Sequence, residues 1–170
     1  MTKKKIAFIV AIPGSAHSFL IDHFRQLVEF YDVHLIANFL NDNDKEEFEE
    51  LGVICHNAPI ERSISILYDL KALMTLQKIF KQEKFVSTHS VTPKAGLLSA
   101  VASWSVGIKI RIHIYTGQVW ATRKGFMRWF LKQMDKMIAL FDNHLLVDGE
   151  AQRQFLIREG VLKPSNSRVL

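Results

Sequence analysis

The chain has 170 residues, of which 48% are hydrophobic and 23% charged, and this composition is typical of one globular domain with a sizeable core, not of a disordered chain. The formal net charge is +5, which suits an anionic partner but does not identify one. One cysteine, Cys55, excludes an intrachain disulfide, and because no second Cys or His follows at zinc-finger spacing we expect a structural thiol and no metal site.

The first residues, MTKKK followed by IAFIVAIP, have the basic and apolar parts of a short secretory signal. The alternative is a buried first strand over 6–12, apolar on both faces. An amphipathic helix pattern follows, and no later run reaches the roughly 18 apolar residues that a membrane crossing needs. We therefore expect the strand, and a cytoplasmic protein.

Strands and helices alternate along the rest of the chain. Helices are predicted at 16–31, 41–52, 64–83, 92–107, 123–141 and 150–160. Further strands are predicted at 33–39, 53–59, 85–90, 109–117 and 143–149, with the start of another at 167–170. The pattern predicts the α/β class, a Rossmann-like three-layer domain with a parallel sheet of about seven strands. No repeat or long linker divides it, so residues 1–170 are expected to form a single domain.

Ligands of such sheets bind outside the carboxyl ends of the strands, here at 13–18, 88–93 and 115–122. The first of these loops contains only Gly14, which disfavours a dinucleotide site, and the P-loop pattern is also missing. A helix start at Gly14 and Ser15 can hold a phosphate or a sugar hydroxyl through free N–H groups. The alternative is that this loop is only the turn and cap of the helix.

Three histidines are candidate catalytic residues. His17, on the first turn of a helix, is either a general base or substrate ligand, or a solvated residue. His89 ends the strand at 85–90 beside Ser90, where exposure to the crevice is expected. His113 lies within the alternating IRIHIY pattern, which favours a structural role, and no G-x-S-x-G elbow organises a triad.

The helix at 123–141 carries basic residues at steps of four: Lys124, Arg128, Lys132 and Lys136. They form one stripe, and aromatic residues including Trp129 occupy other faces. Such a helix suits an anionic membrane surface, which Lys124, Arg128, Lys132 and Trp129 would face. A solvated helix face is the alternative. Nucleic acid is a weaker partner because no binding motif accompanies the charges.

Three segments together resemble a known family: the loop IPGSAHSF, the stretch STHSVTPKAGLLSAVASWSVGIKIRIHIYTGQVWA, and HLLVDGEAQRQFLIREGV. They are similar to the N-terminal half of family 4 glycosyltransferases, which have the GT-B fold and assemble bacterial surface polysaccharides. The resemblance spans essentially the whole chain. It implies retaining transfer of a sugar from a nucleotide-sugar, without a metal or other cofactor, to a glycan acceptor often carried on a membrane lipid.

The resemblance also implies which residues line the cleft. Gly14 and Ser15 stand in the loop near donor phosphate and acceptor, and His89, Thr116 and Gly117 stand at strand tips facing the same cleft, with Ser90 beside them. Many members have a His-Gly pair where this chain has Thr116-Gly117, so His17 or His113 would have to supply any base.

In the family, the C-terminal domain binds most of the nucleotide and carries two glutamates spaced E-x7-E. This chain has no such pair, so the resemblance implies the acceptor-binding half alone, inactive without its native C-terminal domain, located in the cytoplasm and peripheral on the inner membrane face. Two alternatives remain open: a non-catalytic subunit that docks a catalytic partner at the membrane, and another GT-B enzyme such as a nucleotide-sugar epimerase.

Overall fold

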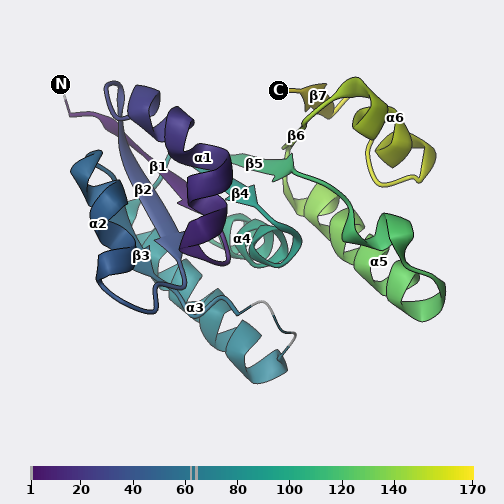
Figure 1. The fold of residues 1–170 in the computed structure, drawn as a ribbon, viewed down its shortest axis with the longest axis horizontal. Helices are drawn as coiled ribbons and strands as arrows, with labels where there is room; N and C mark the ends of the chain where they lie inside the picture. Colours follow the sequence, from purple (N-terminus) through teal and green to yellow (C-terminus); the bar gives the residue numbers. More distant parts are fainter. Residues whose placement is uncertain (1, 62, 64) are drawn as a thin grey trace.

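A computed structural model describes residues 2–61, 63 and 65–170, so position 64, the expected start of the third helix, lies outside the described residues. The strands form one parallel sheet of seven, in the order β3-β2-β1-β4-β5-β6-β7 (Figure 1). Their bounds are β1 Lys4–Ile9, β2 Tyr31–Ala37, β3 Ile54–Asn57, β4 Ser87–Val91, β5 Ile110–Tyr115, β6 His144–Val147 and β7 Ser167–Val169. This confirms the predicted fold class.

Each crossover between neighbouring strands in the chain contains a helix. The helices are α1 Pro13–Leu27, α2 Asn43–Glu50, α3 Ile66–Glu83, α4 Pro93–Ser105, α5 Gly125–Phe141 and α6 Glu150–Arg158, and a 3₁₀ turn, η1 Val119–Thr122, precedes α5. The largest boundary error concerns α1, which begins at Pro13 instead of residue 16 and ends before residue 31. Proline at a first helical turn needs no N–H donor, which allows this earlier start.

The strands separate two apolar layers. Phe8 of β1 packs with Leu20 and Phe24 of α1, whereas its neighbour Ile9 points to the other face, with Leu76 of α3. A third cluster joins α5 and α6 to β6. The arrangement is the predicted three-layer sandwich, and it directs all strand ends, with the loops that follow them, to one edge of the sheet.

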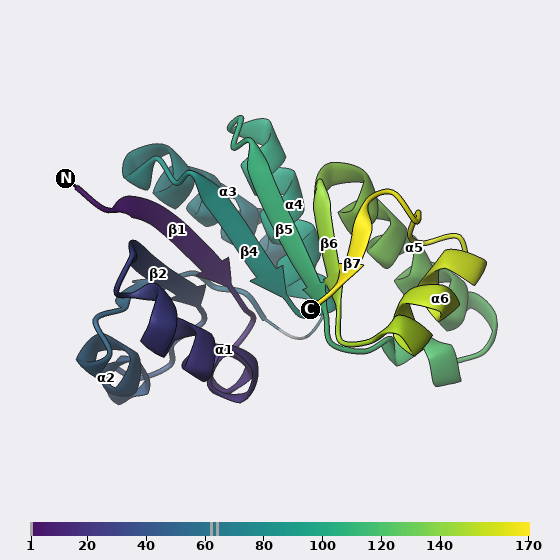
Figure 2. The same cartoon turned by 90° about the horizontal axis from the view of Figure 1, so that it is seen from above.

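One face of the sheet is only partly covered. Helices α1 and α2 lie over the β1–β3 half, while the same face of β4 and β5 has no helix over it (Figure 2). Val86 and Ile110 on this side are 39% and 44% exposed, and a hollow of about 320 Å³ lies beside them. Parallel sheets are usually buried on both faces, so this face is incompletely packed.

Candidate functional site

A cavity of about 390 Å³ opens at the carboxyl edge of the sheet. It is lined by residues of the β1–α1 loop, the β4–α4 junction, η1 and α5: Ala11, Ser15, Thr92, Pro93, Lys94, Val119, Leu131 and Met134. Most of this lining is apolar, and Ser15, Thr92 and Lys94 supply the polar groups. Mainly apolar walls with a few polar groups are typical of pockets that bind small organic ligands.

Two helices begin beside this cavity, α1 at Pro13 and α4 at Pro93. Neither start has a side-chain hydrogen bond to its cap, so backbone N–H groups of the first turns lack side-chain partners. Lys94 does not add a free charge, because its Nζ lies 2.5 Å from Oδ1 of Asp69 on α3. The site therefore offers hydroxyls and helix N-termini more than a free cation.

Thr92, at the start of the predicted fourth helix, has an unusual conformation. Its φ is +75° and its ψ is 142°, a region that non-glycine residues rarely adopt. Its Oγ1 is buried and has no hydrogen-bond partner among the described residues. Sequence reasoning missed this residue as a site candidate because a Thr-Pro pair at a helix start is normally a cap.

Gly14 and Ser15 lie on opposite sides of the first turn of α1. Ser15 faces the cavity at the carboxyl edge, whereas Gly14 and His17 line a separate hollow of about 330 Å³ against α2. There Nε2 of His17 lies 3.2 Å from Oε1 of Glu47. His17 is thus an exposed residue paired across two helices, and it does not line the 390 Å³ cavity.

His113 and Ser90 are core residues, which agrees with the structural role favoured for His113 and corrects its alternative use as a base and the expected place of Ser90 in the cleft. His113 is 2% exposed and Ser90 is 1% exposed, and Oγ of Ser90 lies 2.8 Å from Nδ1 of His113. Burial lowers the pKa of His113 to about 3, so the ring is neutral at physiological pH. Its contacts leave it no access to a ligand.

His89 also differs from expectation, because it lies in the middle of β4 and not at its tip. Its ring stacks on Phe8 with centroids 4.6 Å apart, and Nε2 is 3.1 Å from Oγ of Ser87. Burial lowers its pKa to about 4. The hollow it lines is the one on the uncovered sheet face, away from the strand ends.

Thr116 and Gly117 follow β5 at the carboxyl edge, as expected. Gly117 has φ +132°, a conformation that favours glycine. Gln152 of α6 fixes this loop, since its Nε2 donates to the carbonyl of Tyr115 at 3.1 Å while its Oε1 accepts from the N–H of Asp148 at 2.9 Å. The loop then turns into η1, where Val119 reaches the cavity.

Two of the four basic residues of the predicted stripe share one carboxylate within the fold. Glu159 binds both Arg128, at 3.0 Å, and Lys132, at 2.6 Å. Both cations also lie over the ring of Trp120, at 5.2 and 5.7 Å from its centroid. Trp120 in turn donates its indole N–H to Oδ2 of Asp135 at 2.7 Å. Arg128 and Lys132 therefore hold η1 against α5 and α6, which corrects their expected place facing a membrane.

Lys124 of the predicted stripe, the residue before α5, is exposed. Trp129 is 57% exposed and Phe126 is 72% exposed, with ring centroids 5.8 Å apart. The exposed surface at the start of α5 is therefore aromatic with a basic edge.

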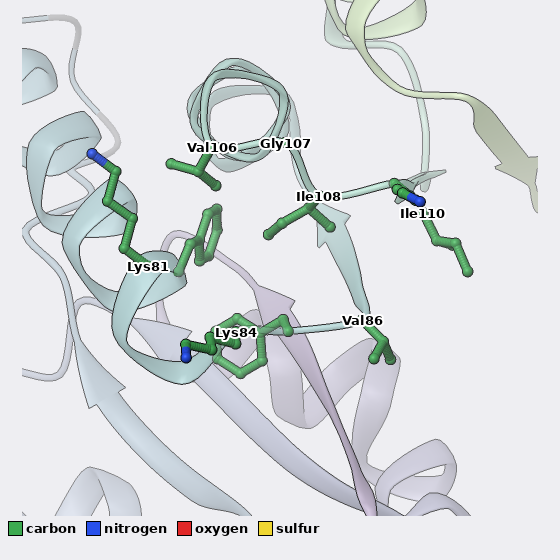
Figure 3. A pocket seen from close by; sticks show the side chains of 10 residues that line it. Lys81, Lys84, Val86, Val106, Gly107, Ile108 and Ile110 are labelled. Carbon is green, nitrogen blue, oxygen red and sulfur yellow. The ribbon is translucent and has the colours of Figure 1, made fainter.

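A second cavity, of about 530 Å³, lies at the opposite, amino-terminal edge of the sheet. Figure 3 shows Lys81 and Lys84 on its α3 side and Ile108 across from them. Helices α3 and α4 both end here, and lysines near helix C-termini stabilise the helix dipole. That role accounts for these cations without a ligand.

In residues 2–61, 63 and 65–170, no group of three or more His, Cys, Asp and Glu side chains converges to form a metal site. Burial raises the pKa of the Cys55 thiol to about 12, so it is not a thiolate nucleophile. Over the same residues, no helix has the length and apolar character needed to cross a membrane.

No family model matches the chain. It is 29% identical over 175 residues to the capsular polysaccharide biosynthesis glycosyltransferase CapM of Staphylococcus aureus, covering 100% of this chain and 44% of the relative. It is 23% identical over 180 residues to the Escherichia coli UDP-Gal:alpha-D-GlcNAc-diphosphoundecaprenol alpha-1,3-galactosyltransferase, covering 99% of this chain and 44% of the relative. The chain thus spans less than half the length of both curated relatives.

Solved structures with the same fold include the UDP-N-acetylglucosamine 2-epimerase of Rickettsia bellii, with a TM-score of 0.72 and 14% identity over 98% of this chain and 44% of that chain. Anabaena HepE, solved in complex with UDP and glucose, has a TM-score of 0.71 and 14% identity over 99% of this chain and 44% of that chain. At such low identity these likenesses concern the fold. The chain has the Rossmann-like α/β fold found in GT-B enzymes.

Proposed function

We propose that the chain is the acceptor-binding domain of a retaining glycosyltransferase, which transfers a sugar from a nucleotide-sugar to a lipid-linked glycan in capsule or lipopolysaccharide synthesis. The observation that carries this proposal is the similarity over the whole chain to two glycosyltransferases, one of capsule synthesis and one whose name specifies a diphosphoundecaprenol-linked acceptor. The family resemblance of the strand-tip loops supports the same reaction class.

The cavity at the carboxyl edge is the proposed acceptor site. Its apolar wall of Val119, Leu131 and Met134 suits the apolar face of a sugar ring, and Ser15 supplies a hydroxyl. The predicted Thr116 and Gly117 are proposed to act as a rim beyond Val119. Among the predicted bases only His17 is exposed, so the chemical step is assigned to groups outside this cavity.

The nucleotide-sugar is proposed to bind mainly to a second, C-terminal domain of the natural protein. Two observations support this. The chain matches only 44% of each relative. The incompletely packed face of β4 and β5 is consistent with further protein covering it.

Peripheral contact with the cytoplasmic face of the membrane is a further part of the proposal. Phe126, Trp129 and Lys124 at the start of α5 supply exposed aromatic and basic groups, the combination that suits the interface of an anionic bilayer. The contact is assigned to these residues and not to Arg128 and Lys132, since those bind Glu159.

A nucleotide-sugar epimerase is the second candidate function, because the epimerase of Rickettsia bellii matches this fold with a TM-score of 0.72. A non-catalytic docking subunit is a third. The whole-chain similarity to named transferases favours transfer over both.

The test uses the full-length protein with a panel of UDP-sugars and a farnesyl-diphosphate-linked N-acetylglucosamine acceptor. We expect a product that is larger by one sugar in mass spectrometry, with the anomeric configuration of the donor retained in NMR. Conversion of UDP-N-acetylglucosamine without acceptor would identify an epimerase instead. If the protein binds its nucleotide but forms neither product, an enzymatic role is contradicted.

A further inference from the structure

We propose that Thr92 is a specificity-determining residue of the carboxyl-edge cavity, and that its hydroxyl hydrogen-bonds a sugar hydroxyl of the acceptor. The inference rests on the proposed function for the identity of the ligand. It adds that the fold holds Thr92 in a backbone conformation that is unfavourable for a non-glycine residue. Threonine at position 92 therefore serves the binding of a ligand at a cost in the stability of the fold.

The backbone of Thr92 is the first observation. A φ of +75° with a ψ of 142° belongs to a region that is populated almost only by glycine, because a Cβ collides with the flanking peptide groups. A β-branched residue is among the least suited to it. Such strain persists where the surroundings impose it, and it occurs often at binding sites.

The hydroxyl of Thr92 is the second observation. Its Oγ1 is buried and unpartnered among the described residues, although buried hydroxyls normally have a partner. Thr92 is the cap residue of α4, yet its side chain makes no cap hydrogen bond. A capping role thus does not account for the threonine, and a glycine here would avoid both the strain and the unpaired group.

The surroundings indicate the ligand class. Thr92 lines the cavity together with Ser15 and the apolar residues Val119, Leu131 and Met134. Two hydroxyl-bearing residues opposite an apolar wall complement a pyranose ring, which has an apolar face and hydroxyls at its edge. Since Oγ1 is buried and not exposed to the cavity, we expect the ligand to engage it through rotation about χ1, which threonine permits between staggered wells.

The experiment compares Thr92→Gly, Thr92→Val and Thr92→Ser in the full-length protein, with Thr75→Val as the matched control. Thr75 lies on the exposed side of α3, where its hydroxyl donates to the carbonyl of Lys71. Two quantities are measured: the Tm, and the Kd of farnesyl-diphosphate-linked N-acetylglucosamine by calorimetry.

Thr92→Gly relieves the strain and removes the hydroxyl, so we expect a higher Tm together with binding weakened about tenfold, the effect of one neutral hydrogen bond. Thr92→Val removes only the hydroxyl and should weaken binding equally without lowering the Tm. Thr92→Ser keeps the hydroxyl and should bind as the wild type does, and Thr75→Val should leave the Kd unchanged.

Wild-type affinity in Thr92→Gly and Thr92→Val would overturn the inference, as would a lowered Tm in both, or a wild type that does not bind the probe. Sugar transfer is assayed separately. If the protein transfers sugar but the Thr92 variants bind the acceptor as the wild type does, the inference is rejected and the proposed function is kept. If the Thr92 variants bind the acceptor more weakly but the protein transfers no sugar, the inference is kept and the proposed function is rejected.

Discussion

Oγ of Ser90 lies 2.8 Å from Nδ1 of His113 in the layer between the sheet and α4. The imidazole fills the space beside Gly96, where an added Cβ would lie 2.4 Å from Cε1 and 2.7 Å from Nδ1 of the ring. A glycine is therefore needed at position 96, because a side chain there would collide with His113 of β5. This pairing packs α4 closely against β5.

Gly96→Ala should destabilise the domain by about 2–3 kcal/mol, because the new methyl group must displace a buried, hydrogen-bonded ring. Urea unfolding followed by circular dichroism measures the change. Gly14→Ala is the matched control, since Gly14 also lies in the first turn of a helix but its Cβ would have room. The control should be neutral or stabilising because alanine favours helix. Equal losses in both variants would contradict the packing argument.

His34 makes the protein sensitive to acid. Its Nδ1 lies 2.8 Å from Nε2 of His56, and burial, followed by the charge of His56, lowers its pKa from 6.5 to about 4. Because the folded-state pKa is the lower one, the unfolded chain binds the proton first, and stability falls as the pH drops from 6.5 toward 4. In His34→Phe the loss of urea midpoint between about pH 7.5 and pH 5 should be smaller than in the wild type. An unchanged loss would contradict this assignment.

Asp142 has the opposite pH dependence. Burial raises the pKa of its carboxyl from 3.8 to about 7, so ionisation is harder in the folded state and stability falls as the pH rises from 3.8 through 7. Asp142→Asn should therefore stabilise the protein by about 2 kcal/mol at about pH 8 and by much less near pH 4.5. Asp148→Asn serves as the control, in which the free energy of unfolding should change little because the side chain is exposed. A gain that is equal at both pH values would contradict a titration effect.

Binding to anionic membranes should depend on the start of α5. Phe126→Ser with Trp129→Ser, or Lys124→Glu, should weaken cosedimentation with phosphatidylglycerol vesicles, since each basic residue near such a surface contributes about 1 kcal/mol. Phe30→Ser is the control, because Phe30 is also an exposed aromatic residue, at 68%, but lies beyond α1. Loss in the control alone, or no loss in any variant, would exclude the proposed contact surface.

Much of the fold could be predicted from the sequence. The buried strands are short apolar runs, and the helices between them repeat with a period that strands cannot have, so element order and parallel topology follow. The boundary of α1 was less certain because Pro13 fits a turn and a first helical turn equally well. Its end at Leu27 is set by the start of β2 at Tyr31.

The candidate site was predicted only in part. The three loops at the carboxyl edge follow from topology, and Ser15 does line the cavity found there. His89 and Ser90 were misplaced because β4 continues to Val91, one residue beyond its predicted end, so both lie within the strand and not at its tip. Arg128 and Lys132 were predicted to face a membrane because their partner Glu159 is distant in sequence and binds them only in the folded chain. Thr92 could not be foreseen, since its backbone angle has no sequence signal.

The conformation of Thr92 also has an evolutionary consequence. A library selected only for resistance to heat should accumulate substitutions at this position early, with glycine foremost, because glycine adopts a positive φ without strain. Stabilising changes at a binding site commonly reduce function. Selection for sugar transfer should restore a hydroxyl-bearing residue there. Opposing pressures on this one codon would support the proposed role of the carboxyl-edge cavity in binding an acceptor.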